Sequence, residues 1–129
     1  MRDLTHNDIS TSVLDCCFKI HRTLGPGLFE SVYESILCQE LTNAGLHFVR
    51  QQTIPVVWKG IKLNQGFRAD LIVESKVLIE IKSIAALAPV HNMQVLTYLK
   101  LTNLSLGLLI NFNNALLKDG IKRVINGSI

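Results

Sequence analysis

The first third of the 129-residue chain carries apolar residues at helical spacing, in two separate stretches. The first stretch runs from about Ile9 to Leu24 and follows Thr5 and Asn7, either of which suits the cap of a helix. The segment Gly25–Gly27 interrupts the pattern, and the second stretch extends from about Leu28 to Ala44. The chain is therefore expected to begin with two helices joined by a glycine-rich turn.

The middle of the chain changes to the short apolar runs that are typical of β-strands. Phe48–Gln52 and Pro55–Trp58 are expected to be two strands. Because proline cannot donate a ladder hydrogen bond, Pro55 marks an edge strand or a bend. Lys59-Gly60 is expected to form the next turn, and Ile61–Phe67 leads into a second hairpin.

That second hairpin, over residues 68–82, has two apolar arms around a polar turn at Glu74–Lys76. Its expected cross-strand pairs are Val73–Val77, Ile72–Leu78, Leu71–Ile79, Asp70–Glu80 and Arg68–Lys82. Because side chains alternate between the two faces of a strand, the four charged residues of these pairs are expected to share one face.

A further helix is expected after the hairpin. Pro89 suits the first turn of a helix, and the apolar pattern continues to about Leu101. The positions expected to form its apolar side are Val90, Met93, either Leu96 or Tyr98, and Leu99.

The last third also contains two strand patterns. Leu104–Phe112 is a nearly continuous apolar run, typical of a strand that is buried on both faces. Ile121–Ile125 is expected to be a short final strand. The order of elements predicts a single α/β domain over residues 1–129, with a mixed sheet.

Composition indicates the kind of partner and the compartment of the protein, but not its function. The net charge of +3 permits an anionic partner but does not require one. Cys16, Cys17 and Cys38 lack CxxC spacing and are expected to be free, mostly buried thiols. No apolar signal core and no run long enough to span a membrane is evident, so a cytoplasmic protein with no membrane partner is expected.

The predicted hairpin brings two carboxylates together. Residues directly opposite each other across strands have Cβ atoms about 4.5–5.5 Å apart, and two carboxylates at that spacing repel unless a proton or a cation lies between them. Asp70 and Glu80 therefore suit a hard divalent cation such as Mg²⁺ or Mn²⁺, with the carbonyl of Ile81 as a further ligand. Lys82, two residues after Glu80, could orient water or neutralise charge on a phosphate.

A second cation would need another carboxylate, and the helical pair Glu30 and Glu34 offers one. These two glutamates are one turn apart and share a face of the second helix. A ladder of salt bridges on a wet sheet face is the alternative explanation for the hairpin charges. It accounts for the opposite charges but not for Asp70 directly opposite Glu80, because like charges there destabilise a sheet.

These residues resemble the motifs of the PD-(D/E)xK nuclease superfamily. Asp70 and Glu80-Ile81-Lys82 match its two acidic motifs, and Gln94 to Tyr98 is similar to the QxxxY element of its recombination-exonuclease branch. The segment from Gly27 to Tyr33 resembles the signature of the GxxExxY protein family, a small group within that superfamily. Ala69 replaces the proline of the superfamily name, a position that the wider group varies.

The resemblance implies a restriction-endonuclease-like core, α-β-β-β-α-β, preceded here by an extra N-terminal helix. It implies that Asp70 and Glu80 are metal ligands and that Lys82 is the catalytic lysine. Glu30 would be the helical carboxylate that faces the metal, with Glu34 as the fallback. The residues expected to contact substrate are Gln94, Tyr98 and Arg68.

The resulting prediction is a Mg²⁺-dependent (or Mn²⁺-dependent) nuclease that acts on DNA, and less favourably on RNA. A non-catalytic module that binds a nucleic acid or a protein partner is the alternative. A homodimer is also expected, because a small nuclease would grip a duplex better as a pair, and the mean hydropathy of +0.30 fits an apolar face left for association.

Overall fold

The computed structural model describes residues 3–129, except for the side chains of Asn64 and Gln65. Its elements, in chain order, are α1 (His6–Leu24), α2 (Glu30–Asn43), β1 (Phe48–Trp58), β2 (Ile61–Val73), β3 (Val77–Lys82), α3 (Pro89–Thr102), β4 (Leu106–Asn111), the short 3-10 helix η1 (Leu117–Gly120) and β5 (Ile121–Ile125). The expected α/β class and the α-β-β-β-α-β order, here α2 to β4, are confirmed. The extra N-terminal helix is α1, and Thr5 caps it in a reciprocal pair of hydrogen bonds with Asp8.

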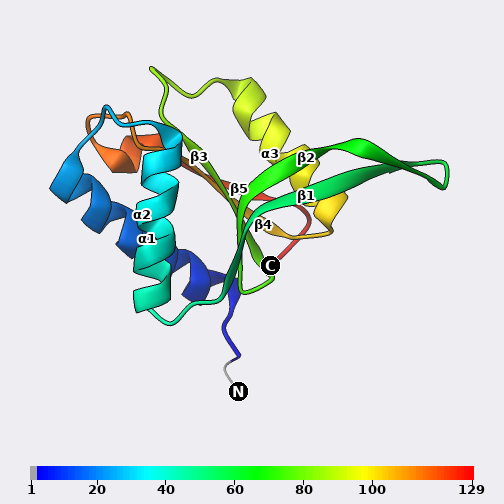
Figure 1. Cartoon of the computed structure of the whole chain (residues 1–129), viewed down its shortest axis with the longest axis horizontal. Coiled ribbons are helices and arrows are strands. Elements are labelled where there is room, and N and C mark those ends of the chain that lie inside the picture. Colours follow the sequence, from blue (N-terminus) through cyan, green and yellow to red (C-terminus); the bar gives the residue numbers. More distant parts are fainter. Residues whose placement is uncertain (1–2) are drawn as a thin grey trace.

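The strands form one five-stranded mixed sheet in the order β1-β2-β3-β4-β5. Only the β3–β4 pair is parallel, and the helix α3 connects those two strands. Helices α1 and α2 cover one face of the sheet, and α3 covers the other (Figure 1). All six residues of β4 are buried, as expected for the central apolar run.

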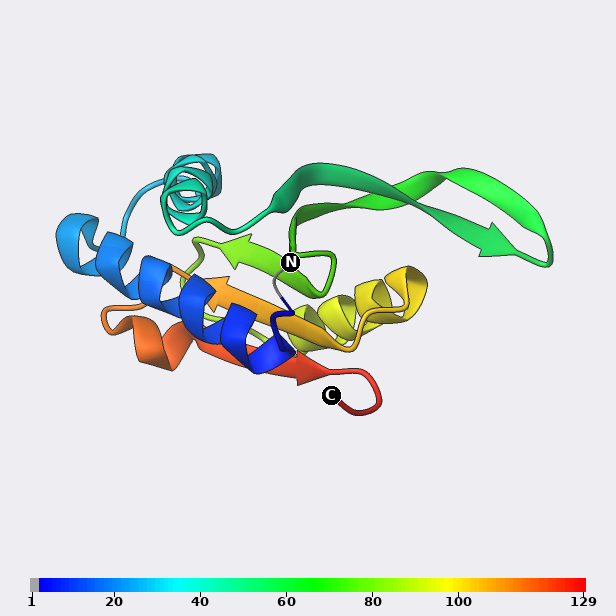
Figure 2. The ribbon, with the colours of Figure 1, turned by 90° about the horizontal axis from the view of Figure 1, so that it is seen from below.

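Strands β1 and β2 extend beyond the other strands of the sheet. β1 has 11 residues and β2 has 13, whereas β3 and β4 have six each. Their distal ends continue together past α3 as a two-stranded projection, which we call the arm and define as residues 55–66 (Figure 2). The expectation of two strands between Phe48 and Trp58 was wrong, because β1 is continuous. Pro55 instead marks a register shift between Ile54 and Val56 on this edge strand.

The β2–β3 hairpin has the expected turn and the first three expected pairs, down to Leu71–Ile79. The expected pairs Asp70–Glu80 and Arg68–Lys82 are wrong. Arg68 pairs with Thr53 of β1 instead, because β2 follows β1 toward the arm and separates from β3. Where the two strands separate, a side chain replaces a backbone carbonyl as the hydrogen-bond acceptor. Oδ2 of Asp70 accepts a hydrogen bond from the backbone N–H of Ile81 at 2.8 Å.

Among residues 3–129, no helix is both long enough and apolar enough to cross a membrane. The three cysteines are free, as expected, with Cys17 and Cys38 buried and Cys16 half-buried.

Candidate active site

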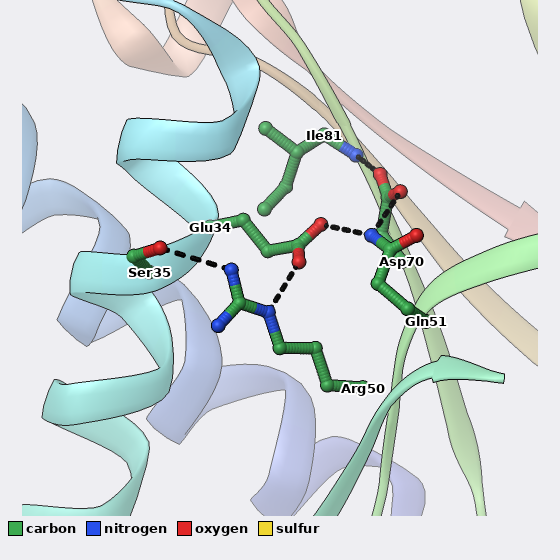
Figure 3. A network of polar contacts seen from close by, with 6 residues as sticks. All are labelled: Glu34, Ser35, Arg50, Gln51, Asp70 and Ile81. Atoms are coloured by element: carbon green, nitrogen blue, oxygen red, sulfur yellow. Dashed lines mark hydrogen bonds and ion pairs between the residues drawn. The ribbon is translucent and has the colours of Figure 1, made fainter.

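Asp70 lies in the gap where β2 and β3 part, and both of its carboxylate oxygens are held. Oδ2 accepts the hydrogen bond from Ile81, and Oδ1 accepts one from the side-chain amide of Gln51 at 3.3 Å (Figure 3). One donor comes from β3 and the other from β1. The carboxylate is therefore fixed between the two strands that flank β2.

The contact with Gln51 depends on an irregularity in β1. Consecutive strand residues normally point to opposite faces of a sheet, yet Arg50 and Gln51 both contact Glu34 of α2. Gln51 has a φ angle of +54°, in the left-handed region that non-glycine residues adopt at a cost of about 1–2 kcal/mol. This conformation turns two successive polar side chains toward the same helix.

Glu34 is the buried member of the helical pair, only 5% exposed. Its Oε2 accepts a hydrogen bond from Nε of Arg50 at 2.6 Å, and its Oε1 accepts one from the Gln51 amide at 2.7 Å. Arg50 also donates to Oγ of Ser35. The Gln51 amide thus joins the carboxylates of Glu34 and Asp70, each of which takes a hydrogen bond from it (Figure 3).

Glu30 lies one turn earlier on α2, at the wall of a cavity of about 470 Å³. The cavity is lined by Glu30, Ser31, Glu34, Arg50, Gln51, Arg68 and Asp70. The structure therefore brings both helical glutamates and Arg68 to the same hollow as Asp70. Glu34 rather than Glu30 is the one connected to Asp70 by hydrogen bonds.

Glu80 and Lys82 approach the same gap from β3. Nζ of Lys82 is 3.5 Å from Oε2 of Glu80, whose residue is 8% exposed. The other oxygen, Oε1, is buried, and no group within residues 3–129 donates a hydrogen bond to it. A buried carboxylate oxygen without a donor is costly, because it has lost its water and gained no partner.

The two acids of the gap resist ionising together. Burial raises the pKa of Glu80 to about 7, and the negative charge of Asp70 adds to this rise while Lys82 opposes it. The pKa of Asp70 is also raised, chiefly by burial and further by the charge of Glu34, against the hydrogen bond from Ile81. A proton or a cation between the two carboxylates would relieve this repulsion.

The residues from α3 differ in their relation to this gap. Tyr98 stacks on Phe67 of β2, with ring centroids 3.7 Å apart and planes 4° apart. Burial raises the pKa of the Tyr98 hydroxyl, and the charges of Glu80 and Asp70 raise it further, so the ring lies within their field. Gln94, one turn earlier, is exposed and makes no hydrogen bond to the described site residues.

The donor set fits a hard divalent cation that is shared with substrate. Within the described part of the chain, no three His, Cys, Asp or Glu side chains are arranged to hold a metal ion. Mg²⁺, however, is usually held by one or two carboxylates together with water and substrate phosphate, not by an all-protein cage. Asp70 and Glu80, with the donorless Oε1, have the chemistry of such a smaller set of oxygen ligands.

Sequence analysis did not find the roles of Arg50 and Gln51. Both lie in a strand whose pattern gives no sign that two consecutive side chains turn to one side. Their partner Glu34 is 16 and 17 residues earlier, on a different element. The only available signal was the presence of polar residues in an otherwise apolar strand.

The mixed sheet and the order of its helices are those of the restriction-endonuclease-like class. The family model described as the PD-(D/E)XK nuclease superfamily matches residues 7–124, which is nearly the whole chain, and the chain belongs to that superfamily. Comparison with curated proteins gave no significant match. Comparison with solved structures gave none either.

Proposed function

We propose that this chain is a Mg²⁺-dependent (or Mn²⁺-dependent) nuclease that hydrolyses phosphodiester bonds in DNA, with RNA as the less favoured substrate. Membership of the PD-(D/E)XK nuclease superfamily supports a nuclease-type function, since that superfamily generally hydrolyses phosphodiester bonds and typically uses divalent metals. The observation that carries the proposal is the buried, donorless Oε1 of Glu80 in the gap that also holds Asp70. Such a pair of acids has a physical reason to bind a cation.

Asp70, Glu80 and the backbone carbonyl of Ile81 would hold the cation, with a helical carboxylate facing it. Glu30 and Glu34 both remain candidates for that carboxylate, because both line the cavity beside Asp70. Glu34 is favoured because Gln51 connects it to Asp70 by hydrogen bonds. Glu30 is favoured because it lines the cavity and its carboxylate is not held by Arg50 or Gln51. When bound, the cation would polarise the phosphoryl oxygen and lower the pKa of its water.

The remaining residues would act directly on the substrate. Nζ of Lys82 lies 3.5 Å from Oε2 of Glu80 and would stabilise negative charge that develops on the phosphate. Arg68 is exposed on the cavity wall and would donate to phosphate oxygens. Tyr98, stacked on Phe67, would help order the site, and Gln94 is available to contact the substrate from the exposed side of α3.

We also propose membership of the narrower GxxExxY family. Its signature corresponds to Gly27, Glu30 and Tyr33, of which Glu30 lines the cavity and Tyr33 is buried. A cytoplasmic location is supported by the free thiols, which are typical of reducing compartments. A homodimer is supported by large exposed apolar side chains such as Phe29, which is 78% exposed.

The test is cleavage of DNA by purified protein with Mg²⁺ or Mn²⁺, compared with Asp70→Ala and Lys82→Ala. Each substitution is expected to lower the rate by roughly 100- to 1,000-fold, the usual effect of removing one group that stabilises transition-state charge. Circular dichroism would check that both variants keep the fold. Equal cleavage by the wild type and both variants would identify a contaminating nuclease and remove the proposal.

One observation favours a second candidate, a non-catalytic module that binds a nucleic acid or a protein partner. Glu34 is already satisfied by Arg50 and Gln51, so this acid does not require a cation. A protein of this second kind would show no cation-dependent cleavage and no binding of Mg²⁺ or Mn²⁺ in the gap.

A further inference from the structure

The positive charge of the chain is concentrated in the β1–β2 hairpin. Residues 48–69 contain four basic residues, Arg50, Lys59, Lys62 and Arg68, and no Asp or Glu. The rest of the chain holds the other nine basic residues and all ten acidic ones, so it is close to neutral with one excess negative charge. The modest net charge of the whole chain therefore conceals a strongly basic hairpin.

The arm has one apolar face, and its other face carries a lysine. Its register pairs Val56 with Leu63, Val57 with Lys62, and Trp58 with Ile61. Because partners in a ladder share a face, Val56, Trp58, Ile61 and Leu63 lie on one side, and Lys62 lies on the other together with Val57. Trp58 is 64% exposed, and Nζ of the neighbouring Lys59 is 5.7 Å from its ring centroid, so the tip combines an aromatic ring with a cation.

Three of the hairpin cations are available to a partner. Arg50 is engaged by Glu34, but Lys59, Lys62 and Arg68 are exposed and form no ion pair with any of the residues described. Arg68 lines the cavity at the base of the arm, beside Asp70. Exposed cations therefore lie both beside the candidate active site, at Arg68, and near the tip of the arm, at Lys59 and Lys62.

The size of the arm suits a nucleic-acid groove. Thr53, the partner of Arg68, is five residues before Trp58, a reach of about 17 Å at roughly 3.4 Å per residue. That length corresponds to about five base pairs at roughly 3.4 Å each. A two-stranded β-ribbon is one of the elements that the major groove, about 12 Å wide, admits.

We propose that the arm is the DNA-gripping element of this protein and lies in a groove of the duplex whose backbone enters the cavity. This inference rests on the proposed nuclease function and deepens it by naming double-stranded DNA as the substrate form. Lys59, Lys62 and Arg68 contact phosphates, and the apolar side of the tip, with Trp58, contacts sugars and base edges.

Two other partners of the arm, a second copy of the chain and a single-stranded nucleic acid, fit it less well than a duplex. A second copy of the chain would cover the apolar face, but paired arms would bring lysines together without any acidic residue on either arm. A single strand is usually bound in a concave groove with several stacking aromatics. The arm is a projection from the body (Figure 2). It has one exposed aromatic ring, that of Trp58, since Phe67 at its base is stacked on Tyr98.

The test is the affinity for a fluorescent DNA duplex of about 20 base pairs, two helical turns, measured by anisotropy across a range of salt concentrations. A Lys82→Ala background slows turnover of the duplex during the measurement. Changing both arm lysines, Lys59→Gln with Lys62→Gln, is expected to reduce the slope of log affinity against log salt by about two. Lys118→Gln with Lys122→Gln removes the same charge from exposed residues at the opposite edge of the sheet and is expected to leave the slope unchanged.

Trp58 is tested in the same assay. Trp58→Ala is expected to weaken binding roughly 5- to 100-fold, the range for loss of one aromatic contact with a base, and Trp58→Phe is expected to restore most of the affinity. Unchanged binding in both arm variants would overturn the proposal. Tighter binding of the single strand than of the duplex by the Lys82→Ala protein would also overturn it. A third contrary result is an arm variant that loses the dimer in sedimentation but keeps its affinity for DNA.

Failure of this inference is distinguishable from failure of the proposed function. A wild type that cleaves DNA, with arm variants that bind as it does, would remove the role of the arm alone. A wild type that cleaves nothing would remove the nuclease, while the salt titration would still decide whether the arm binds DNA.

Discussion

At the residue scale, the site depends on how three carboxylates are kept apart. Glu34 is neutralised by Arg50, and the Gln51 amide donates to both Glu34 and Asp70. No corresponding donor reaches Oε1 of Glu80 within residues 3–129. The unfavourable electrostatics of the site are therefore concentrated on Glu80.

The raised pKa of Glu80 predicts how stability changes with pH in the cation-free protein. Its pKa of about 7 when folded lies above the ordinary value of 4.5, so the folded state binds the proton more tightly than the unfolded state. Stability is therefore expected to fall as the pH rises from about 5 to 8, by on the order of 2 kcal/mol. Urea unfolding in the presence of a chelator would measure this change.

Glu80→Gln is the matched variant for this measurement, because it keeps the shape and removes the ionisation. We expect it to be more stable than the wild type near pH 8 and to lose most of the pH dependence. A wild type that gains stability over that range, or a variant that keeps the whole loss, would show that Glu80 ionises normally in the folded protein.

At the element scale, a glycine and a tyrosine hold the turn before α2 and so position Glu30. Gly27 has a φ angle of +108°, which residues with a side chain rarely adopt. The Tyr33 hydroxyl donates to the carbonyl of Gly25 at 2.6 Å and accepts from the N–H of Leu28 at 3.2 Å. Its ring stacks on Phe112, so these contacts fix the start of α2 and with it Glu30.

Tyr33→Phe is expected to lower the free energy of unfolding by about 1–2 kcal/mol, because it leaves the turn carbonyl and N–H without their partner. Urea unfolding would measure the loss. Tyr98→Phe is the control, since no hydrogen bond of the Tyr98 hydroxyl is found in the described part of the chain, and it is expected to be nearly neutral for stability. Equal losses in the two variants would contradict the role given to the Tyr33 hydroxyl.

Local signals in the sequence predicted the elements, and long-range pairing limited the rest. The Thr5 cap and the Glu74–Lys76 turn were predictable because each depends on neighbouring residues. The apolar side of α3 was not, since Val90 and Met93 are 61% and 63% exposed, while Leu99 is buried as expected. That helix has apolar residues on several sides, so spacing alone could not rank them.

For the candidate site, too, local spacing identified the residues, whereas their geometry depends on long-range strand pairing. The charged residues of the β2–β3 hairpin could be found from their spacing, but their geometry could not. The pairing of β2 with β1 draws Arg68 away from β3, and Asp70 then binds the backbone of Ile81 instead of standing opposite Glu80. Nothing within the hairpin sequence indicates where its two strands separate.

At the scale of the whole molecule, the fold places the acids in the gap between β2 and β3 and the basic hairpin next to them. The acidic gap opens beside a cavity whose wall includes Arg68, and the arm continues from that wall away from the body (Figure 2). An acidic centre repels a nucleic acid unless cations offset it. We therefore expect a divalent cation to occupy the gap before substrate enters it.

The most direct test of that expectation is a calorimetric titration of the protein with Mn²⁺ or Mg²⁺ at neutral pH. We predict saturable binding by the wild type and its loss in Asp70→Asn. We also predict that Lys82→Ala binds the cation at least as tightly as the wild type, because a competing positive charge 3.5 Å from Glu80 is removed. A wild type that binds neither cation at millimolar concentration would contradict the metal-dependent nuclease and leave the non-catalytic module.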